Sequence, residues 1–212
     1  MSKPDLMALA EEERTELLAL LRTLTDTQWN APSLCSQWRV RDVATHVVSY
    51  DELSKATLAA TFLRGALRVS RVNDVALKRY DALEPDDIID LVSRNTRGLT
   101  SGFRGGIALT DGTIHHQDIR RALGLARTIP TSRLPAVLDF ALQAPTLPAK
   151  KHAKNLSLVA TDIDWSTGEG PEIIGTAEAL LMCVAGRTQA LDELSGPGLG
   201  TLRSRVVRTR AS

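Results

Sequence analysis

Apolar residues recur at helical spacing through the first 125 residues, and this periodicity limits the fold more than any other feature. Residues 5–24 carry a stripe of leucines, with Glu11 to Glu13 on the opposite side. The other expected helices are residues 40–67, a short one within 68–80 that includes Asn73, one starting near Glu84 and Pro85, and residues 109–123 ending at Gly124. Four long helices with modest connections predict an antiparallel four-helix bundle.

The pattern changes after Pro130. One short helix lies among four prolines, and the alternation of NLSLVATDIDW predicts a strand. We expect PEIIGT to form a second strand, TAEALLMCVAG a helix capped by Thr176, and GPGLGTLRSRVV a turn and a last strand. The sequence therefore predicts an α+β fold, with a four-helix bundle in residues 1–128 and a small α/β domain in residues 129–212.

Composition excludes several classes of protein. The chain is 43% hydrophobic and 24% charged, as in an ordinary globular protein, and its formal net charge is +1. Neither this charge nor an aromatic content of 4% favours binding to nucleic acid. No apolar run approaches the roughly 20 residues of a membrane span. We therefore expect a protein that binds neither nucleic acid nor a membrane. We expect it to be a monomer or a homodimer.

The cysteines and the N-terminal residues indicate a cellular compartment. Cys35 and Cys183 are too few for a disulfide scaffold, and they do not form a CxxC pair. The first residues, MSKPDLMALAEEERTE, contain no apolar segment of the kind found in secretory signals. These features predict a cytoplasmic protein.

Three side chains form a candidate metal site. Asp111 and His115 are four residues apart on a predicted helix, so both lie on one face. His46 on the second predicted helix would be the third ligand. Two imidazoles and a carboxylate are typical ligands of zinc with an open fourth position. The spacing alone leaves another interpretation open, in which Asp111 stabilises a helix start, His115 and His116 form a surface pair, and His46 is a hydrogen-bonded core residue.

Two segments resemble the mycothiol-dependent maleylpyruvate isomerase family, within the DinB-like metal-binding bundles. WNAPSLCSQWRVRDVATHVVSYDEL is similar to the N-terminal signature of that family, and DGTIHHQDIRRALGL is similar to its second signature. The segment LVATDIDWSTGEGPEIIGTAEALLMCVAGR also resembles the end domain of many members. On this resemblance, the metal-binding histidine of the family falls on His46, and its acidic residue and second histidine fall on Asp111 and His115. Characterised members have Glu where this chain has Asp111.

The resemblance implies a function. It implies a divalent metal, most simply zinc, with nickel or another first-row ion as alternatives. It also implies mycothiol as a co-substrate, whose metal-held thiolate attacks an electrophilic small molecule in an isomerase or transferase reaction. Two other hypotheses stay open: a binding or regulatory module without turnover on the same fold, and a bundle without metal.

Three further side chains have two interpretations each. Asp42 could orient His46, or it could stabilise the start of the second helix. Arg187 could bind an anionic group at the junction of the two domains, or it could be a surface residue. Cys35 could be a reactive thiol, or a small buried apolar residue.

Overall fold

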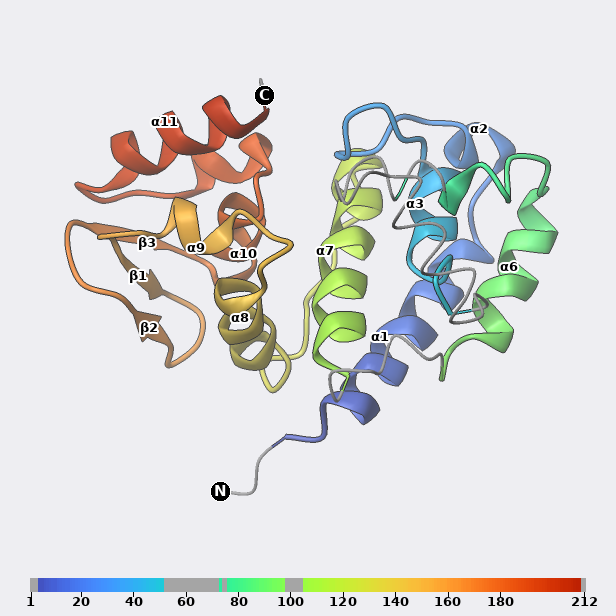
Figure 1. The fold of residues 1–212 in the computed structure, drawn as a ribbon, viewed down its shortest axis with the longest axis horizontal. Coiled ribbons are helices and arrows are strands. Elements are labelled where there is room, and N and C mark those ends of the chain that lie inside the picture. Colours follow the sequence, from blue (N-terminus) through green and yellow to red (C-terminus); the bar gives the residue numbers. More distant parts are fainter. Residues whose placement is uncertain (1–3, 52–72, 74–75, 98–104, 211–212) are drawn as a thin grey trace. The chain divides into compact units, whose positions relative to one another are not determined.

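The structure is a computed structural model that describes residues 4–51, 73, 76–97 and 105–210 (Figure 1). The chain divides into two compact units, Met1–Arg127 and Thr128–Ser212. The first is helical, and the second combines helices with a three-stranded sheet. The predicted α+β class is therefore confirmed. None of the helices among the described residues is long and apolar enough to cross a bilayer.

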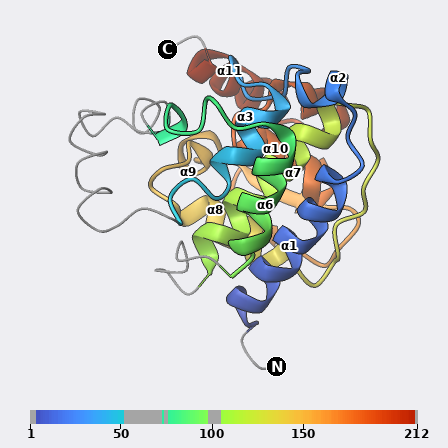
Figure 2. The same ribbon diagram turned by 90° about the vertical axis from the view of Figure 1, so that its right-hand side faces the viewer.

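Helices of the first unit pack around one apolar core. Figures 1 and 2 show α1 beside α6 and α7, and α3 also packs against α6 and α7. Leu17, Trp29, Val43, Leu91 and Ile119, from five different helices, are all buried in this core. The helices in the described part of this unit are α1 (Leu6–Leu21), α2 (Asp26–Trp29), α3 (Val40–His46), α6 (Pro85–Arg94) and α7 (Gly106–Ala122).

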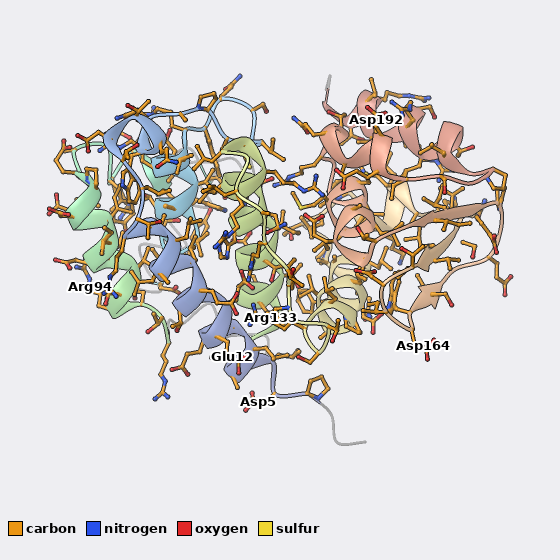
Figure 3. The ribbon with its side chains drawn as sticks, turned by 180° about the vertical axis from the view of Figure 1, so that it is seen from behind. Asp5, Glu12, Arg94, Arg133, Asp164 and Asp192 are labelled. Atoms are coloured by element: carbon orange, nitrogen blue, oxygen red, sulfur yellow. The ribbon has the colours of Figure 1, made fainter. Side chains whose placement is uncertain are left out.

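The ends of these helices follow from local chemistry. Asp5, at the start of α1 in Figure 3, accepts hydrogen bonds from two backbone N–H groups of the first turn. Pro85 opens α6, as the sequence predicts. Gly105, before α7, has a φ of 79°, and a Cβ there would lie 2.5 Å from the Leu6 carbonyl oxygen. Only glycine fits that position, and the predicted cap Gly124 is likewise left-handed, with a φ of 67°.

The prediction of one long helix over residues 40–67 is wrong in its described part, because α3 ends at His46. Residues 47–51 form turns. The buried Arg14 guanidinium of α1 donates to the Val47 carbonyl oxygen at 3.2 Å and pairs with Asp51 at 2.8 Å. The guanidinium thus supplies a partner to a carbonyl oxygen that lies just past the end of α3. Residues 52–67 lie outside the described part, and so does most of the short segment predicted around Asn73.

The second unit places helices around a small mixed sheet with strand order β2-β1-β3. β1 pairs antiparallel with β2 and parallel with β3. Thr176 caps α10 through its side chain, as predicted. The elements are α8 (Leu134–Gln143), α9 (Ala149–His152), β1 (Ser157–Ala160), β2 (Ser166–Thr167), β3 (Glu172–Gly175), α10 (Ala177–Val184), the 3-10 helix η2 (Thr188–Glu193) and α11 (Leu199–Arg210).

The last predicted strand is wrong, because α11 is a helix. Leu202 and Val206 are both fully buried and lie four residues apart, which is one helical turn. The alternating arginines Arg203 and Arg205 suggested a strand, but the apolar spacing decides the structure. The short strand β2 was not expected from the sequence.

A buried ionic network joins α1 to α7 in the first unit. The Glu13 carboxylate is paired with His116 Nδ1 at 2.8 Å and with both Nη atoms of Arg127 at 2.8–2.9 Å. Arg120 donates to the other nitrogen of His116 at 2.8 Å. Burial by itself raises the pKa of Glu13, but His116 and Arg127 outweigh it and lower that pKa from 4.5 to about 2.

This network predicts a loss of stability in acid. A carboxylate whose pKa is lowered on folding stabilises the fold above its unfolded value, and that contribution disappears as the pH falls from about 4.5 to about 2. For Glu13 it amounts to about 3 kcal/mol. Burial also lowers the pKa of His116 from its ordinary 6.5. Below pH 6.5 the unfolded chain therefore binds a proton at His116 more readily than the folded chain, and this adds to the loss of stability in acid.

We therefore expect the free energy of unfolding of Glu13→Gln to depend less on pH between 4.5 and 2 than that of the wild type. Urea unfolding at several pH values measures this. Glu12→Gln, which changes an exposed carboxylate one residue away, is the control and should follow the wild type. Equal pH dependence of Glu13→Gln and the wild type would contradict the assignment.

Candidate metal centre

Two residues of the candidate site lie on one face of α7. Asp111 and His115 are one turn apart, and His115 Nε2 lies 3.5 Å from Asp111 Oδ1. His115 is 8% exposed, whereas the Asp111 side chain is 39% exposed. The pair therefore has a buried imidazole and a carboxylate that solvent can reach.

The third residue, His46, is the last residue of α3. Its Nε2 lies 3.8 Å from the same Asp111 Oδ1, and the His46 and His115 rings meet edge to face with centroids 4.9 Å apart. One ligand atom from each of the three residues lies within 4.8 Å of the other two. The structure thus brings together all three residues of the site predicted from the sequence.

The distances in this group fit a shared ion. Ligand atoms bound to zinc at ordinary lengths in a tetrahedron are about 3.4 Å apart. The separations of Asp111 Oδ1 from the two imidazole nitrogens, 3.5 and 3.8 Å, are near that value and are long for hydrogen bonds.

His46 itself is unusual among buried polar side chains. It is 5% exposed, its Nδ1 has no hydrogen-bond partner, and its Nε2 makes no hydrogen bond to any described residue. Buried polar groups are normally paired, because an unpaired one costs about 1–3 kcal/mol. A cation bound at Nε2 would give that nitrogen a partner, although Nδ1 would still have none among the described residues.

The electrostatics of the centre favour a positive charge. Burial by itself raises the pKa of Asp111, but His115 and then His46 outweigh it and hold that pKa well below its usual value. Burial by itself lowers the pKa of His115, but Asp111, followed by Cys35 and Asp118, raises it well above its usual value. Without a metal, a proton supplies the positive charge between the carboxylate and the imidazoles.

Aromatic rings flank the centre. The Trp38 ring lies 4.8 Å from the His46 ring between centroids, and Tyr50 meets His46 edge to face at 6.0 Å. Trp38 belongs to the loop before α3, and Tyr50 to the turns after it. These rings cover His46 and limit its access to water.

The structure argues against the alternative interpretation of the α7 residues. Asp111 is in the second turn of α7, because the helix begins at Gly106, so this carboxylate is not a helix cap. His115 and His116 are not a surface pair, because both are buried. His116 turns away from the centre and binds Glu13. His46 is a core histidine, but without the hydrogen bond that interpretation requires.

The two further candidates stand apart from the three ligands. Asp42 Oδ2 accepts from the Arg39 backbone N–H at 2.9 Å at the start of α3, and no hydrogen bond joins Asp42 to His46. This favours a role for Asp42 at the helix start. Arg187, in the second unit, donates to the Ala185 carbonyl oxygen at 2.8 Å. Its binding of an anionic group stays a prediction.

Two neighbours of the centre were not selected from the sequence. Asp118 binds His115 Nδ1 at 2.9 Å, and the Trp38 ring lies tilted against His46. Asp118 follows His115 by three residues, and this spacing places both on one helix face. That signal was present in the sequence, whereas the approach of Trp38 depends on the loop.

These features define a protein of two units, with a helical N-terminal unit that holds two histidines and an aspartate around one point. Residues 10–106 match the family described as the mycothiol maleylpyruvate isomerase N-terminal domain. This match covers most of the helical unit and agrees with the resemblance seen in the sequence. No curated protein matches the chain significantly.

Solved structures support the same fold. The chain is similar to the crystal structure of the mycothiol-dependent maleylpyruvate isomerase, with a TM-score of 0.53 and 13% identity over 91% of each chain. A histidine-to-alanine mutant of that isomerase matches with a TM-score of 0.50 and 12% identity, again over 91% of each chain. The likeness extends over both units and shows a shared fold.

Loss of the Asp111 charge tests the centre. At a free zinc concentration of 100 times the wild-type Kd, binding stabilises a folded protein by about 2.7 kcal/mol. We expect Asp111→Asn to lose most of this gain, because it lacks the anionic ligand, and Asp111→Glu to keep it. Thermal unfolding with and without zinc measures the difference. Asp42→Asn is the control, and an unchanged zinc effect in Asp111→Asn would rule out this carboxylate as a ligand.

Proposed function

We propose that the chain is a divalent-metal-binding, mycothiol-dependent enzyme, either a thiol S-transferase or a cis–trans isomerase of the maleylpyruvate isomerase type. The match to this family supports the use of a low-molecular-weight thiol. The group formed by His46, Asp111 and His115 supports the metal. Zinc is the preferred ion, because two imidazoles and one carboxylate are typical of zinc sites with an open position.

One observation carries the proposal. Nδ1 of the buried His46 has no hydrogen-bond partner among the described residues, and its Nε2 lies 3.8 Å from a carboxylate oxygen of Asp111 that is also near His115. A purely structural histidine would be expected to bind a neighbour, as His116 does with Glu13 and His152 with Val184. His46 is therefore the residue whose environment is best explained by a ligand from outside the chain.

The side chains have separate tasks in this proposal. When bound, zinc with an open position lowers the pKa of a thiol and keeps it as the nucleophilic thiolate. His46, Asp111 and His115 hold the ion, and the exposed edge of Asp111 marks the side that solvent reaches. Trp38 and Tyr50 cover His46 and limit water around the ion. The proposed partners are mycothiol and an electrophilic small molecule, in the cytoplasm, with the protein a monomer or a homodimer.

A second candidate is a metal- or ligand-binding regulatory module without turnover. It is favoured by Asp111, which is one methylene shorter than the Glu of characterised members. A shorter ligand draws an ion towards α7 and could leave it unsuited to bind a thiol. Catalysis that disappears in His115→Ala, with the fold intact, would exclude this candidate.

Metal content tests the proposal directly. Elemental analysis of the purified wild type should find about one equivalent of a divalent metal, and His46→Ala and His115→Ala should each lose it, because a site with two ligands binds weakly. His116→Gln is a matched control, since it changes the adjacent histidine outside the site. It should keep the metal, although it weakens the bond to Glu13. A folded wild type that takes up no zinc would contradict the proposal.

Thiol consumption separates the two candidates. The zinc-loaded wild type should accelerate the reaction of mycothiol with at least one member of an electrophile panel, and His115→Ala should not. Product analysis then distinguishes a transferase, which retains the sulfur on the product, from an isomerase, which releases it. A metal-replete protein without any acceleration would favour the regulatory module.

A further inference from the structure

A second carboxylate lies on the far side of His115. Asp118 is completely buried, and its Oδ2 lies 2.9 Å from His115 Nδ1, while His115 Nε2 faces Asp111. The two ring nitrogens of His115 therefore meet different carboxylates. Both carboxylates come from α7, one turn before and one turn after the histidine.

Cys35 joins the same oxygen. Its thiol donates to Asp118 Oδ2 at 3.0 Å, and its Sγ lies 3.6 Å from His115 Nδ1. A backbone hydrogen bond joins the same two segments, because the Leu34 N–H donates to the Asp118 carbonyl oxygen at 3.2 Å. The loop before α3, which also carries Trp38, is thus bonded to α7 at Asp118.

Two groups of potential ligands share His115: His46, Asp111 and His115 in one, and Cys35, His115 and Asp118 in the other. Distances distinguish them. Asp118 Oδ2 is 2.9 Å from the imidazole and 3.0 Å from the thiol, which are hydrogen-bond lengths. Atoms bound to one zinc ion would be about 3.4 Å apart or more. The second group is therefore a set of hydrogen bonds.

We propose that Asp118 is a positioning residue for the metal centre, holding a proton on His115 Nδ1 so that the Nε2 lone pair points towards Asp111 and His46. Cys35, through the same oxygen, fixes the loop that carries Trp38 against His46. This inference rests on the proposed metal site. It extends that site from three ligands to a chain of hydrogen bonds that ends in the loop before α3.

Metal-binding histidines commonly donate their other N–H to a carboxylate, which fixes the tautomer and raises the basicity of the ligand. Loss of such a partner typically weakens metal binding by 10- to 100-fold. In Asp118→Asn, an amide oxygen can still accept the proton, but the charge is lost. In Asp118→Ala, both are lost, so the two variants should form a graded series.

The test is zinc affinity, measured by competition with a chelator. We expect Asp118→Asn to bind about 10-fold more weakly than the wild type and Asp118→Ala about 100-fold more weakly. Glu13→Gln is the matched control, because it removes a buried carboxylate from the neighbouring histidine, His116. It should leave zinc affinity unchanged while lowering thermal stability. Affinity equal to that of the wild type in both Asp118 variants overturns the inference.

A second measurement needs no variant at Asp118. Nitrogen-15 NMR of histidine-labelled, zinc-loaded wild type should show His115 protonated at Nδ1 and metal-bound at Nε2. Metal on Nδ1 overturns the inference. Cobalt substitution tests the thiol separately. A thiolate-to-cobalt charge-transfer band in the near ultraviolet that disappears in Cys35→Ser would show that Cys35 is a ligand, and this would also overturn the inference. Absence of the band supports the hydrogen bond from Cys35 to Asp118.

The failures of the two proposals are distinguishable. A folded wild type that binds no zinc overturns the metal site and this inference together. A wild type that binds zinc tightly, with Asp118→Asn and Asp118→Ala unchanged, overturns the role of Asp118 alone.

Discussion

The end of α3 at His46 is the constraint on which the centre depends. Arg14 is a buried residue of α1. It donates to the Val47 carbonyl oxygen and pairs with Asp51, both in the turns after α3. A buried ion pair of this kind is costly to break, because each partner alone would be an unpaired charge in the core. It holds the turns that follow the end of α3 at His46, and these turns bring Tyr50 against the His46 ring.

Consecutive histidines on α7 illustrate how one helix separates two tasks. Neighbouring residues on a helix point about 100° apart, so His115 and His116 meet different surroundings. His116 is paired with Glu13 and Arg120 in a network that joins α1 to α7. His115 lies between Asp111 and Asp118, and only its Nε2 faces His46. The ionic network and the candidate metal site therefore use adjacent residues of α7.

The sequence predicted the helical unit and the mixed second unit from local signals: apolar periodicity, with Pro85 and Gly124 at helix ends. The spacing of Asp111 and His115, together with the family resemblance, selected the three residues that the structure brings together, and their binding of a metal stays a prediction. The sequence did not predict the end of α3, where the turns that follow are bonded to Arg14, a residue distant in the chain. The sequence analysis also predicted a strand where α11 forms, because the alternation of Arg203 and Arg205 is typical of a strand. The spacing of Leu202 and Val206 is that of one helical turn. The burial of His46 without a hydrogen bond depends on the packing of α3 against α7, which no local pattern encodes.

We propose that one divalent ion is held by three atoms, one each from His46, Asp111 and His115. The most direct measurement is a crystal structure of the zinc-loaded protein with anomalous scattering at the zinc edge. We expect one peak about 2.0–2.2 Å from His46 Nε2, Asp111 Oδ1 and His115 Nε2, with Asp118 Oδ2 retained as the partner of His115 Nδ1. A peak bonded to Cys35 Sγ, or no peak near His46, would contradict it.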